Sequence, residues 1–468
     1  MAEAQAIIER IGAEGIRTVD FRFTDLAGRW RHVAREATRL EACTLEDGIF
    51  IDGSAIPGWR DITESDLLLR PDLDTAFLDP FTAQPTLVLF CDGTEPGTGL
   101  GYERDPRSAA ARAQAHLRGF RRADEVRLAV ELAFFLFDEI KVELGPLHAA
   151  YRLGASEHGG APARSGSSRD GHRPQPDAAY LATPPADHSA DIRAEIASVL
   201  AELGIAGIKQ AHGRASSQCE LTLGVGGLVE AADRFQLAKY VVHQVAASYG
   251  KAATFMPKPM VDEPGSGLHL QTSLWQDGKP IFAGQGYADL SQLCLQFVAG
   301  VMQHARALNA FTNPTTNSYK RLAPGQDEPT LLAYAAHNRS AAVRIPYCAS
   351  AAAKRIEFRF PDSSANPYLA FTAILMAGLD GIEKKLEPGD AMDRNLYDLR
   401  PEEVDDIASV CGSLPEALAA LEADHDFLTK GDVVPPDLIQ AFLAVKRREV
   451  ELVERAPHPV EFQLYLGL

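Results

Sequence analysis

The sequence predicts an α+β protein in two domains, a small one followed by a larger one. Its 468 residues, 46% hydrophobic and 24% charged, have the composition of a globular protein large enough for more than one core. Segments with helical periodicity are interspersed with short runs in which polar and apolar residues alternate, as they do in strands. The turn-rich stretch Asp92–Leu100 contains glycines and a proline and marks the expected domain boundary.

The N-terminal domain is expected to span residues 1–103. Its first element is a helix, because Ala2–Ile11 has an amphipathic pattern. Polar and apolar residues then alternate through Arg17–Phe23 and Trp30–Val33, which predicts a hairpin. Two further runs have the composition of strands: Leu67–Leu69 and Thr86–Cys91.

The C-terminal domain, residues 104–468, is expected to combine long helices with short strands. Between its helices, Gly154–Pro176 is rich in Gly, Ser, Arg, His and Pro and predicts an exposed, mobile loop. The predicted helices occupy Pro106–Leu117, Ala190–Leu203, Ala231–Tyr249 and Ser291–Ala310.

Charge and cysteine content narrow the function. The chain has 46 Lys and Arg residues against 64 Asp and Glu, a net charge of −18, which argues against nucleic acid and anionic membranes as partners. The sequence has no apolar stretch long enough to cross a membrane and charges throughout its N-terminus, so we expect a cytoplasmic protein. The six cysteines lack Cys-x-x-Cys spacing, which favours reduced thiols over a zinc site or disulfides.

Glu131 is the first candidate for chemistry. All the other residues of the predicted strand Leu128–Phe137 are apolar. Burying an unpaired carboxylate costs several kcal/mol, so the Glu131 side chain should be paired or bound to a metal ion.

Three further strands alternate between a polar and an apolar face. Taken singly, each polar face could be solvated and the histidine could be structural. If all four strands line one cavity, their carboxylates and imidazole would suit Mg²⁺ or Mn²⁺. The candidate ligands are Glu131, Glu220 in Gln218–Leu223, His269 in His269–Leu274, and Glu357 in Arg355–Phe360.

Basic residues gather in the same part of the sequence. In an acidic protein, arginines near carboxylates suit a phosphate or carboxylate ligand, although surface ion pairs would explain any one of them. The sequence contains neither a P-loop nor a dinucleotide-binding glycine motif. The basic residues are Lys320, Arg321, Arg339, Arg344, Arg355 and Arg359.

Several segments resemble bacterial type I glutamine synthetases: Asp52–Ser54, Lys251–Pro259, Asn313–Leu322, Asn338–Pro346 and Arg355–Ala377. The resemblance extends from Asp20–Asp25 to His458–Tyr465. It implies a small β-grasp-like N-terminal domain and a large catalytic domain whose curved antiparallel sheet forms a funnel surrounded by helices. It also implies a homo-oligomer, a dodecamer of two hexameric rings, with Arg447–Leu468 in the ring contacts and each active site between two subunits.

The family reaction uses ATP to phosphorylate the side-chain carboxylate of glutamate, and ammonia then displaces the phosphate. The resemblance implies that Glu131, His269 and Glu357 bind one Mg²⁺ or Mn²⁺ and that Glu220 binds a second. Nucleotide contacts are implied for Ser273, Arg344 and Arg355, and substrate contacts for Tyr180, Arg321, Arg339 and Arg359. Catalytic roles are implied for Asp52, Arg339 and Arg359, and for Asp327 or Glu328 in a flap.

The sequence departs from the family pattern inside the site. Ala133 and His212 occupy two of the three positions where the family holds its second metal with glutamate, and His212 could bind a softer metal together with Glu220. Further replacements are Pro264, Gln271 and Ala352.

Two interpretations stay open. The chain is an ATP-dependent ligase that joins glutamate or a related acid to ammonia or another amine, or it is a pseudoenzyme that binds nucleotide and has a regulatory or assembly role, including in mixed rings with an active paralogue. Tyr397 matches the tyrosine that the family modifies by adenylylation, and the sequence leaves its modification undecided.

Overall fold

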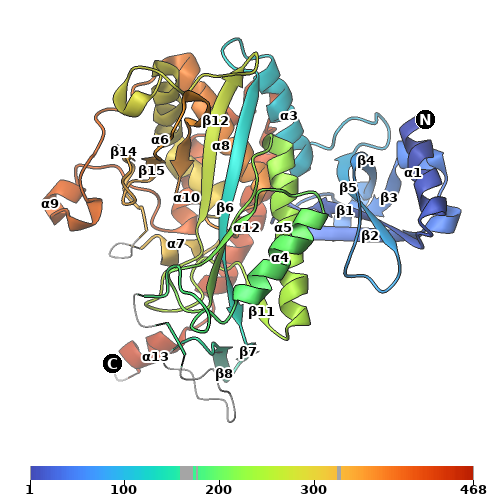
Figure 1. The fold of residues 1–468 in the computed structure, drawn as a ribbon, viewed down its shortest axis with the longest axis horizontal. Helices are drawn as coiled ribbons and strands as arrows, with labels where there is room; N and C mark the ends of the chain where they lie inside the picture. The colour runs from blue at the N-terminus through green and yellow to red at the C-terminus, as the bar shows by residue number, and fades with distance from the viewer. Residues whose placement is uncertain (1, 159–171, 175–177, 324–327, 467–468) are drawn as a thin grey trace.

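The N-terminal domain is built on a mixed sheet whose strand order is β2-β1-β5-β4-β3. The computed structural model describes residues 2–158, 172–174, 178–323 and 328–466 (Figure 1). The predicted hairpin is confirmed, since β1 pairs antiparallel with β2, whereas β1 pairs parallel with β5. Two helices accompany the sheet, α1 (Ala2–Ala13) and α2 (Ala42–Asp47). The strands are β1 (Thr18–Thr24), β2 (Trp30–Glu36), β3 (Ile49–Asp52), β4 (Asp66–Leu78) and β5 (Thr86–Thr94).

The C-terminal domain contains a larger, curved sheet, and its central strands are the ones singled out in the sequence. The strand order within the described residues is β14-β15-β16-β12-β6-β10-β9, with β11 paired to β6 and β13 to β12. All pairs are antiparallel except β14 with β15. The strands are β6 (Glu125–Phe137), β9 (Lys209–His212), β10 (Gln218–Thr222), β11 (Ala252–Thr254), β12 (Leu268–Gln276), β13 (Lys279–Pro280), β14 (Tyr334–Ala336), β15 (Val343–Ile345) and β16 (Ile356–Phe358).

Helices cover one face of this sheet. The residues Leu128, Val130, Leu132 and Phe134 of β6 are buried in the core, and α3 and α5 pack against this strand. Because side chains alternate along a strand, the intervening residue Glu131 faces the opposite side. The predicted helices are confirmed as α3 (Pro106–Arg118), α4 (Ala190–Glu202), α5 (Leu228–Ser248) and α6 (Gln292–Thr312). The further long helices are α8 (Pro367–Lys384), α10 (Leu414–Ala423) and α12 (Pro436–Glu454), and the chain also forms α7 (Ser318–Arg321), α9 (Pro401–Val404), α11 (Asp426–Thr429) and α13 (Pro459–Tyr465).

A single hydrophobic cluster runs through both domains. Polar contacts reinforce the junction: Asn366 donates to the backbone oxygen of Asp25 at 3.0 Å, and Arg104 pairs with Asp437 at 2.6 Å. The N-terminal sheet is therefore held firmly beside the larger domain.

Three details differ from the sequence prediction. An exposed hairpin of β7 (Glu139–Gly145) and β8 (His148–Gly154) was not predicted, and β16 is shorter than the alternating run Arg355–Phe360. Most of the predicted loop Gly154–Pro176 lies outside the described residues, and its described beginning is not exposed, since Glu157 is buried. The polar contacts of Glu157, given below, explain this burial.

The cysteines and helices add two observations. The structure describes all six cysteines, and each of them is a free thiol. Among the described helices, none combines the length and the apolar character that a membrane crossing needs.

Candidate active site

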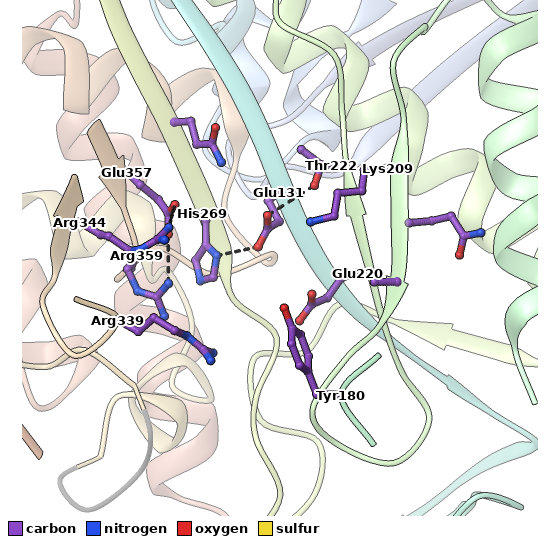
Figure 2. A pocket seen from close by; sticks show the side chains of 13 residues that line it. Glu131, Tyr180, Lys209, Glu220, Thr222, His269, Arg339, Arg344, Glu357 and Arg359 are labelled. Carbon is purple, nitrogen blue, oxygen red and sulfur yellow. Dashed lines mark hydrogen bonds and ion pairs between the residues drawn. The ribbon is translucent and has the colours of Figure 1, made fainter. Parts of the chain in front are cut away.

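A cavity of about 300 Å³ opens on the face of the large sheet that the helices leave uncovered (Figure 2). Strand pairing brings its side chains together: His269 of β12 stands opposite Glu131 of β6, which stands opposite Thr222 of β10. Nine of the residues singled out in the sequence line this cavity, namely Glu131, Tyr180, Glu220, His269, Gln271, Arg339, Arg344, Glu357 and Arg359.

Glu131 and His269 form the central pair of the cavity. The His269 Nδ1 atom lies 3.0 Å from Glu131 Oε1, and the Thr222 hydroxyl donates to Glu131 Oε2 at 3.4 Å. Burial by itself would raise the pKa of Glu131, but the hydrogen bond and positive charge of His269, helped by Lys209 and Arg359, lower it to about 2. The Glu131 carboxylate is therefore ionised at neutral pH, as a metal ligand must be.

Glu357 faces the arginine side of the cavity. Its Oε2 accepts from Arg344 Nη1 at 2.9 Å, and its Oε1 accepts from Arg359 Nη1 at 3.0 Å. Arg339 is an exposed side chain of the same cavity, so three guanidinium groups surround this end. Such groups bind carboxylate and phosphate oxygens with two parallel hydrogen bonds, which suits an anionic substrate.

The donor set of one metal ion is present. Glu131, His269 and Glu357 offer two carboxylates and an imidazole from three neighbouring strands, a chemistry that fits Mg²⁺ or Mn²⁺. The three donors do not form a compact cluster here, and each Glu357 oxygen accepts a hydrogen bond from an arginine. A carboxylate has about four lone-pair sites, so an ion at this position would share Glu357 with its arginine partners or displace one of them.

The residues around Glu220 offer few ligands for a second divalent ion. Glu220 stands between Ala133 of β6 and Ala211 of β9, and alanine side chains provide no oxygen ligand. Burial and the negative charge of Glu131 raise the pKa of Glu220, although His269, Arg339 and Lys209 oppose the effect. The residues around Glu220 therefore do not fit a hard dication in the way that the Glu131 side does.

The prediction that His212 could share a metal with Glu220 is wrong. His212 pairs in register with Cys219, whereas Ala211 pairs with Glu220, so strand alternation turns the imidazole away from the cavity. His212 is 1% exposed, and its Nε2 lies 3.0 Å from Glu157 Oε2 while its Nδ1 lies 2.9 Å from the backbone oxygen of Gly213. The residue is part of a buried structural pair.

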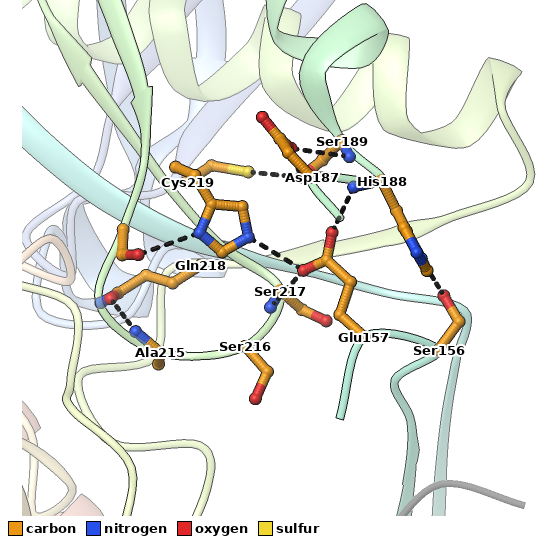
Figure 3. Close-up of polar contacts among 12 residues, drawn as sticks. Ser156, Glu157, Asp187, His188, Ser189, Ala215, Ser216, Ser217, Gln218 and Cys219 are labelled. Atoms are coloured by element: carbon orange, nitrogen blue, oxygen red, sulfur yellow. Dashed lines mark hydrogen bonds and ion pairs between the residues drawn. The ribbon is translucent and has the colours of Figure 1, made fainter. Parts of the chain in front are cut away.

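Within the described residues, Glu157, Asp187 and His212 are the one set of three possible metal ligands whose donor atoms lie within 4.8 Å of one another. Figure 3 shows Glu157 between the backbone nitrogens of Ser217 and His188, which donate to it at 2.7 Å each. Both oxygens of Asp187 accept from Arg193, at 3.0 and 2.5 Å. These internal partners satisfy the carboxylates without an ion.

We expect the His212–Glu157 pair to stabilise the fold most between about pH 4.5 and 6.5. Burial opposes both charges, but the mutual hydrogen bond and attraction lower the pKa of Glu157 and raise that of His212. The contribution of Glu157 is present above its unfolded value of about 4.5 and is lost on acidification; that of His212 is present below about 6.5 and is lost as the pH rises through its folded pKa.

Urea unfolding of the wild-type chain and a His212→Gln variant checks this expectation. The loss of stability in the variant should be about 1.5–3 kcal/mol near pH 5.5, the range for a hydrogen bond to a charged group, and should shrink near pH 8.5. A difference that stays constant across this range would mean that folding does not change the pKa of His212 and would contradict the charged pair.

Arg321 does not contact the cavity, contrary to the expected role in substrate binding. Its side chain is fully buried, and its guanidinium donates to the backbone oxygens of Phe360, Pro361 and Arg359 at 3.0–3.1 Å. The glycines of the sequence Gly265-Ser-Gly267 explain the fit, because a Cβ atom at Gly267 would lie 2.9 Å from Arg321 Nη2. Arg321 therefore has a structural role, in which it holds the backbone of residues 359–361.

Of the two flap candidates, the structure describes only Glu328. Glu328 accepts from Arg321 Nη2 at 2.7 Å and lines a smaller hollow of about 50 Å³ beside the main cavity. Ala133 and Pro264, two of the positions that depart from the family pattern, line the same hollow. Asp327 lies outside the described residues.

Three other predicted residues lie outside both cavities of the described chain. Arg355 donates from Nε to Gln271 Oε1 at 2.6 Å, and through Gln271 it borders the main cavity. Ser273 accepts from the indole nitrogen of Trp275 at 3.1 Å. Asp52 lies at the end of β3 in the N-terminal domain, where it accepts from the backbone nitrogen and hydroxyl of Ser54 at 2.9 and 2.6 Å.

Sequence reasoning missed Lys209, Gln210, Ala211 and Thr222 as lining residues of the cavity. The short strand β9 has no regular alternation of its own, and within it the comparison with the family pattern singled out only His212. Pairing β9 with the predicted strand Gln218–Leu223 would have identified Lys209 as a lining residue, because Lys209 then stands opposite Thr222.

The fold and the cavity define a class of protein in which a small mixed-sheet domain accompanies a curved sheet lined with carboxylates and arginines. The protein-family model of the glutamine synthetase β-grasp domain matches residues 15–96. The family model of the glutamine synthetase catalytic domain matches residues 103–465. The chain therefore belongs to the glutamine synthetase family. Both the predicted family and the predicted fold class are confirmed.

Similar proteins support this assignment over the whole chain. A glutamine synthetase of Rhizobium meliloti is 49% identical over 472 residues, covering 100% of both chains. The solved structure of the Plasmodium falciparum glutamine synthetase is 28% identical with a TM-score of 0.90, covering 99% of this chain and 98% of that one. The structure of GmaS in complex with ADP is 30% identical with a TM-score of 0.83, covering 98% of this chain and 99% of that one.

Proposed function

We propose that this protein is an ATP-dependent ligase that joins an amine to a carboxylate through an acyl phosphate. The proposed acid is glutamate or a close relative, and the proposed amine is ammonia or a larger amine. The observation that carries the proposal is the cavity itself, in which Glu131 and His269 face Arg339, Arg344 and Arg359 in a chain of the glutamine synthetase family.

The residues divide the work between cation and anion. Glu131, His269 and Glu357 would hold Mg²⁺ or Mn²⁺, whose charge offsets that of the phosphates during phosphoryl transfer. Arg344 and Arg359 would move from Glu357 to anionic oxygens when substrate and metal bind. A relative of similar structure, GmaS, has been solved with ADP, which supports a nucleotide as one ligand.

The residues around Glu220 support an amine larger than ammonia as the second substrate. Tyr180 is half exposed and lies beside Glu220 in Figure 2. Next to them, Ala133 takes the place of a carboxylate in the family pattern and leaves a small hollow. A short apolar side chain at this point makes room for an amine larger than ammonia.

The second candidate function is a nucleotide-binding protein without turnover that regulates or joins an active synthetase. The two alanines that flank Glu220 favour it, since they weaken the site for a second ion. In either case we propose a dodecamer of two hexameric rings. Asp52 lines neither the main cavity nor the smaller hollow beside it, and this position supports a site completed by a neighbouring subunit.

Phosphate release from ATP tests the proposal. The purified full-length chain is assayed with Mg²⁺ or Mn²⁺, glutamate and either ammonium or a panel of amines. We expect phosphate release that requires both acid and amine, together with an amide product seen by mass spectrometry. Saturable ATP binding without turnover under all these conditions would contradict the ligase and favour the second candidate.

A further inference from the structure

The Glu220 side of the cavity contains a cation of its own. Lys209 stands opposite Thr222, and Thr222 stands opposite Glu131, so these three side chains form a row across β9, β10 and β6. All three line the cavity, and Figure 2 shows the Lys209 ammonium pointing towards Glu131. Among the described residues, no carboxylate lies within ion-pair distance, 4.0 Å, of this ammonium.

The neighbouring row across the same strands lacks the ligands of a metal ion. It consists of Ala211, Glu220 and Ala133, in which only Glu220 has a side-chain oxygen. A lone carboxylate near an ammonium group is a poor site for a divalent ion, because the lysine both offsets the carboxylate charge and repels the ion.

The charges of the cavity point the same way. Its lining contains three carboxylates and four side chains that are cationic at neutral pH, one lysine and three arginines. The cavity thus has more positive than negative charge before any ion binds. When a polyphosphate enters with one metal ion, the excess positive charge of the lining offsets part of the negative charge that remains.

We propose that Lys209 takes the place of a second divalent ion, so that the phosphates of the nucleotide are held by one metal ion and one lysine. The ammonium is a compact point charge on a flexible stem, suited to phosphate oxygens. Lys209 is then a binding residue. This inference rests on the proposed function, since it assumes that the cavity binds ATP.

Two binding experiments test the role of Lys209. Mn²⁺ titrations of the full-length chain, followed by electron paramagnetic resonance of free Mn²⁺, compare the wild type with the matched variants Glu131→Gln and Glu220→Gln. We expect Glu131→Gln to remove one bound ion and Glu220→Gln to leave the number unchanged. If Glu220→Gln also removes an ion of its own, the proposal is wrong.

The second experiment measures ATP binding in EDTA by calorimetry, so that no metal contributes. Loss of a cation in contact with phosphate should weaken ATP binding about tenfold in Lys209→Met, whereas Lys209→Arg keeps the charge and should stay within about threefold of the wild type. Equal affinity of the wild type and Lys209→Met would overturn the proposal.

Turnover separates the two proposals. In one outcome, both binding experiments give the expected results while the wild-type chain releases no phosphate with any acid and amine. That outcome contradicts the ligase and leaves the role of Lys209 standing. Normal turnover by a chain that binds two Mn²⁺ ions supports the ligase and contradicts the proposed role of Lys209. A chain that binds no ATP, with or without Mn²⁺, overturns both.

Discussion

Replacing Glu131 with glutamine should remove more than 99% of ATP-dependent phosphate release. The substitution keeps the size of the side chain but removes the negative charge that pairs with His269 and that a divalent ion requires. Even residues that only support a metal ligand change metal affinity or activity by about 10–100-fold, so loss of a ligand should cost at least that much. Steady-state phosphate release at saturating Mg²⁺ measures the effect.

A matched control lies on the same strand. Glu125 is on the same face of β6 as Glu131, and it pairs with Arg127 at 2.6 Å away from the cavity. Glu125→Gln should therefore keep its turnover. Sedimentation should show both variants in the assembly of the wild type. Failure of Glu131→Gln to fold or assemble would mean that this carboxylate is structural and would remove it from the proposed site.

Replacing Arg321 with methionine should destabilise the protein by about 3–5 kcal/mol, the cost of removing one partner of a buried ion pair. The variant leaves Glu328 without its 2.7 Å partner and deprives three buried backbone oxygens of their donor. Chemical unfolding followed by intrinsic fluorescence measures the change. We expect a markedly lower urea midpoint before any effect on substrate affinity is considered.

Arg339→Met provides the contrast. Arg339 is exposed in the cavity, so its removal should change the stability by no more than about 0.5 kcal/mol while reducing turnover. If Arg321→Met instead keeps its urea midpoint and raises the KM for the acid, Arg321 contacts substrate, and its burial here would describe only the substrate-free chain.

Much of the fold followed from local patterns in the sequence. The helices α3, α4, α5 and α6 have clear apolar periodicity, and their observed bounds differ from the predicted ones by a few residues. The exposed hairpin β7–β8 was missed although Ile140, Val142 and Leu144 alternate with charged residues, a pattern typical of a strand. That these apolar side chains are exposed depends on the surroundings of the strand, and alternation does not reveal it.

The candidate site shows where local patterns fail. Glu131 was identified as the one charged residue of the otherwise apolar run Leu128–Phe137, and His269 by the alternation of polar and apolar residues along its strand. Arginines near carboxylates in the sequence gave no such distinction. Arg321 and Arg359 have the same chemistry, yet one is enclosed by backbone oxygens while the other faces the cavity.

The family, the α+β class and the strands that carry the carboxylates could be inferred from the sequence, because they depend on residue types and on their spacing along the chain. That His212 points away from the cavity and Lys209 into it could be seen only in the folded protein. The register between strands determines the face on which a side chain emerges, and here Cys219 pairs with His212 and Thr222 with Lys209. A shift by one residue would exchange the two faces.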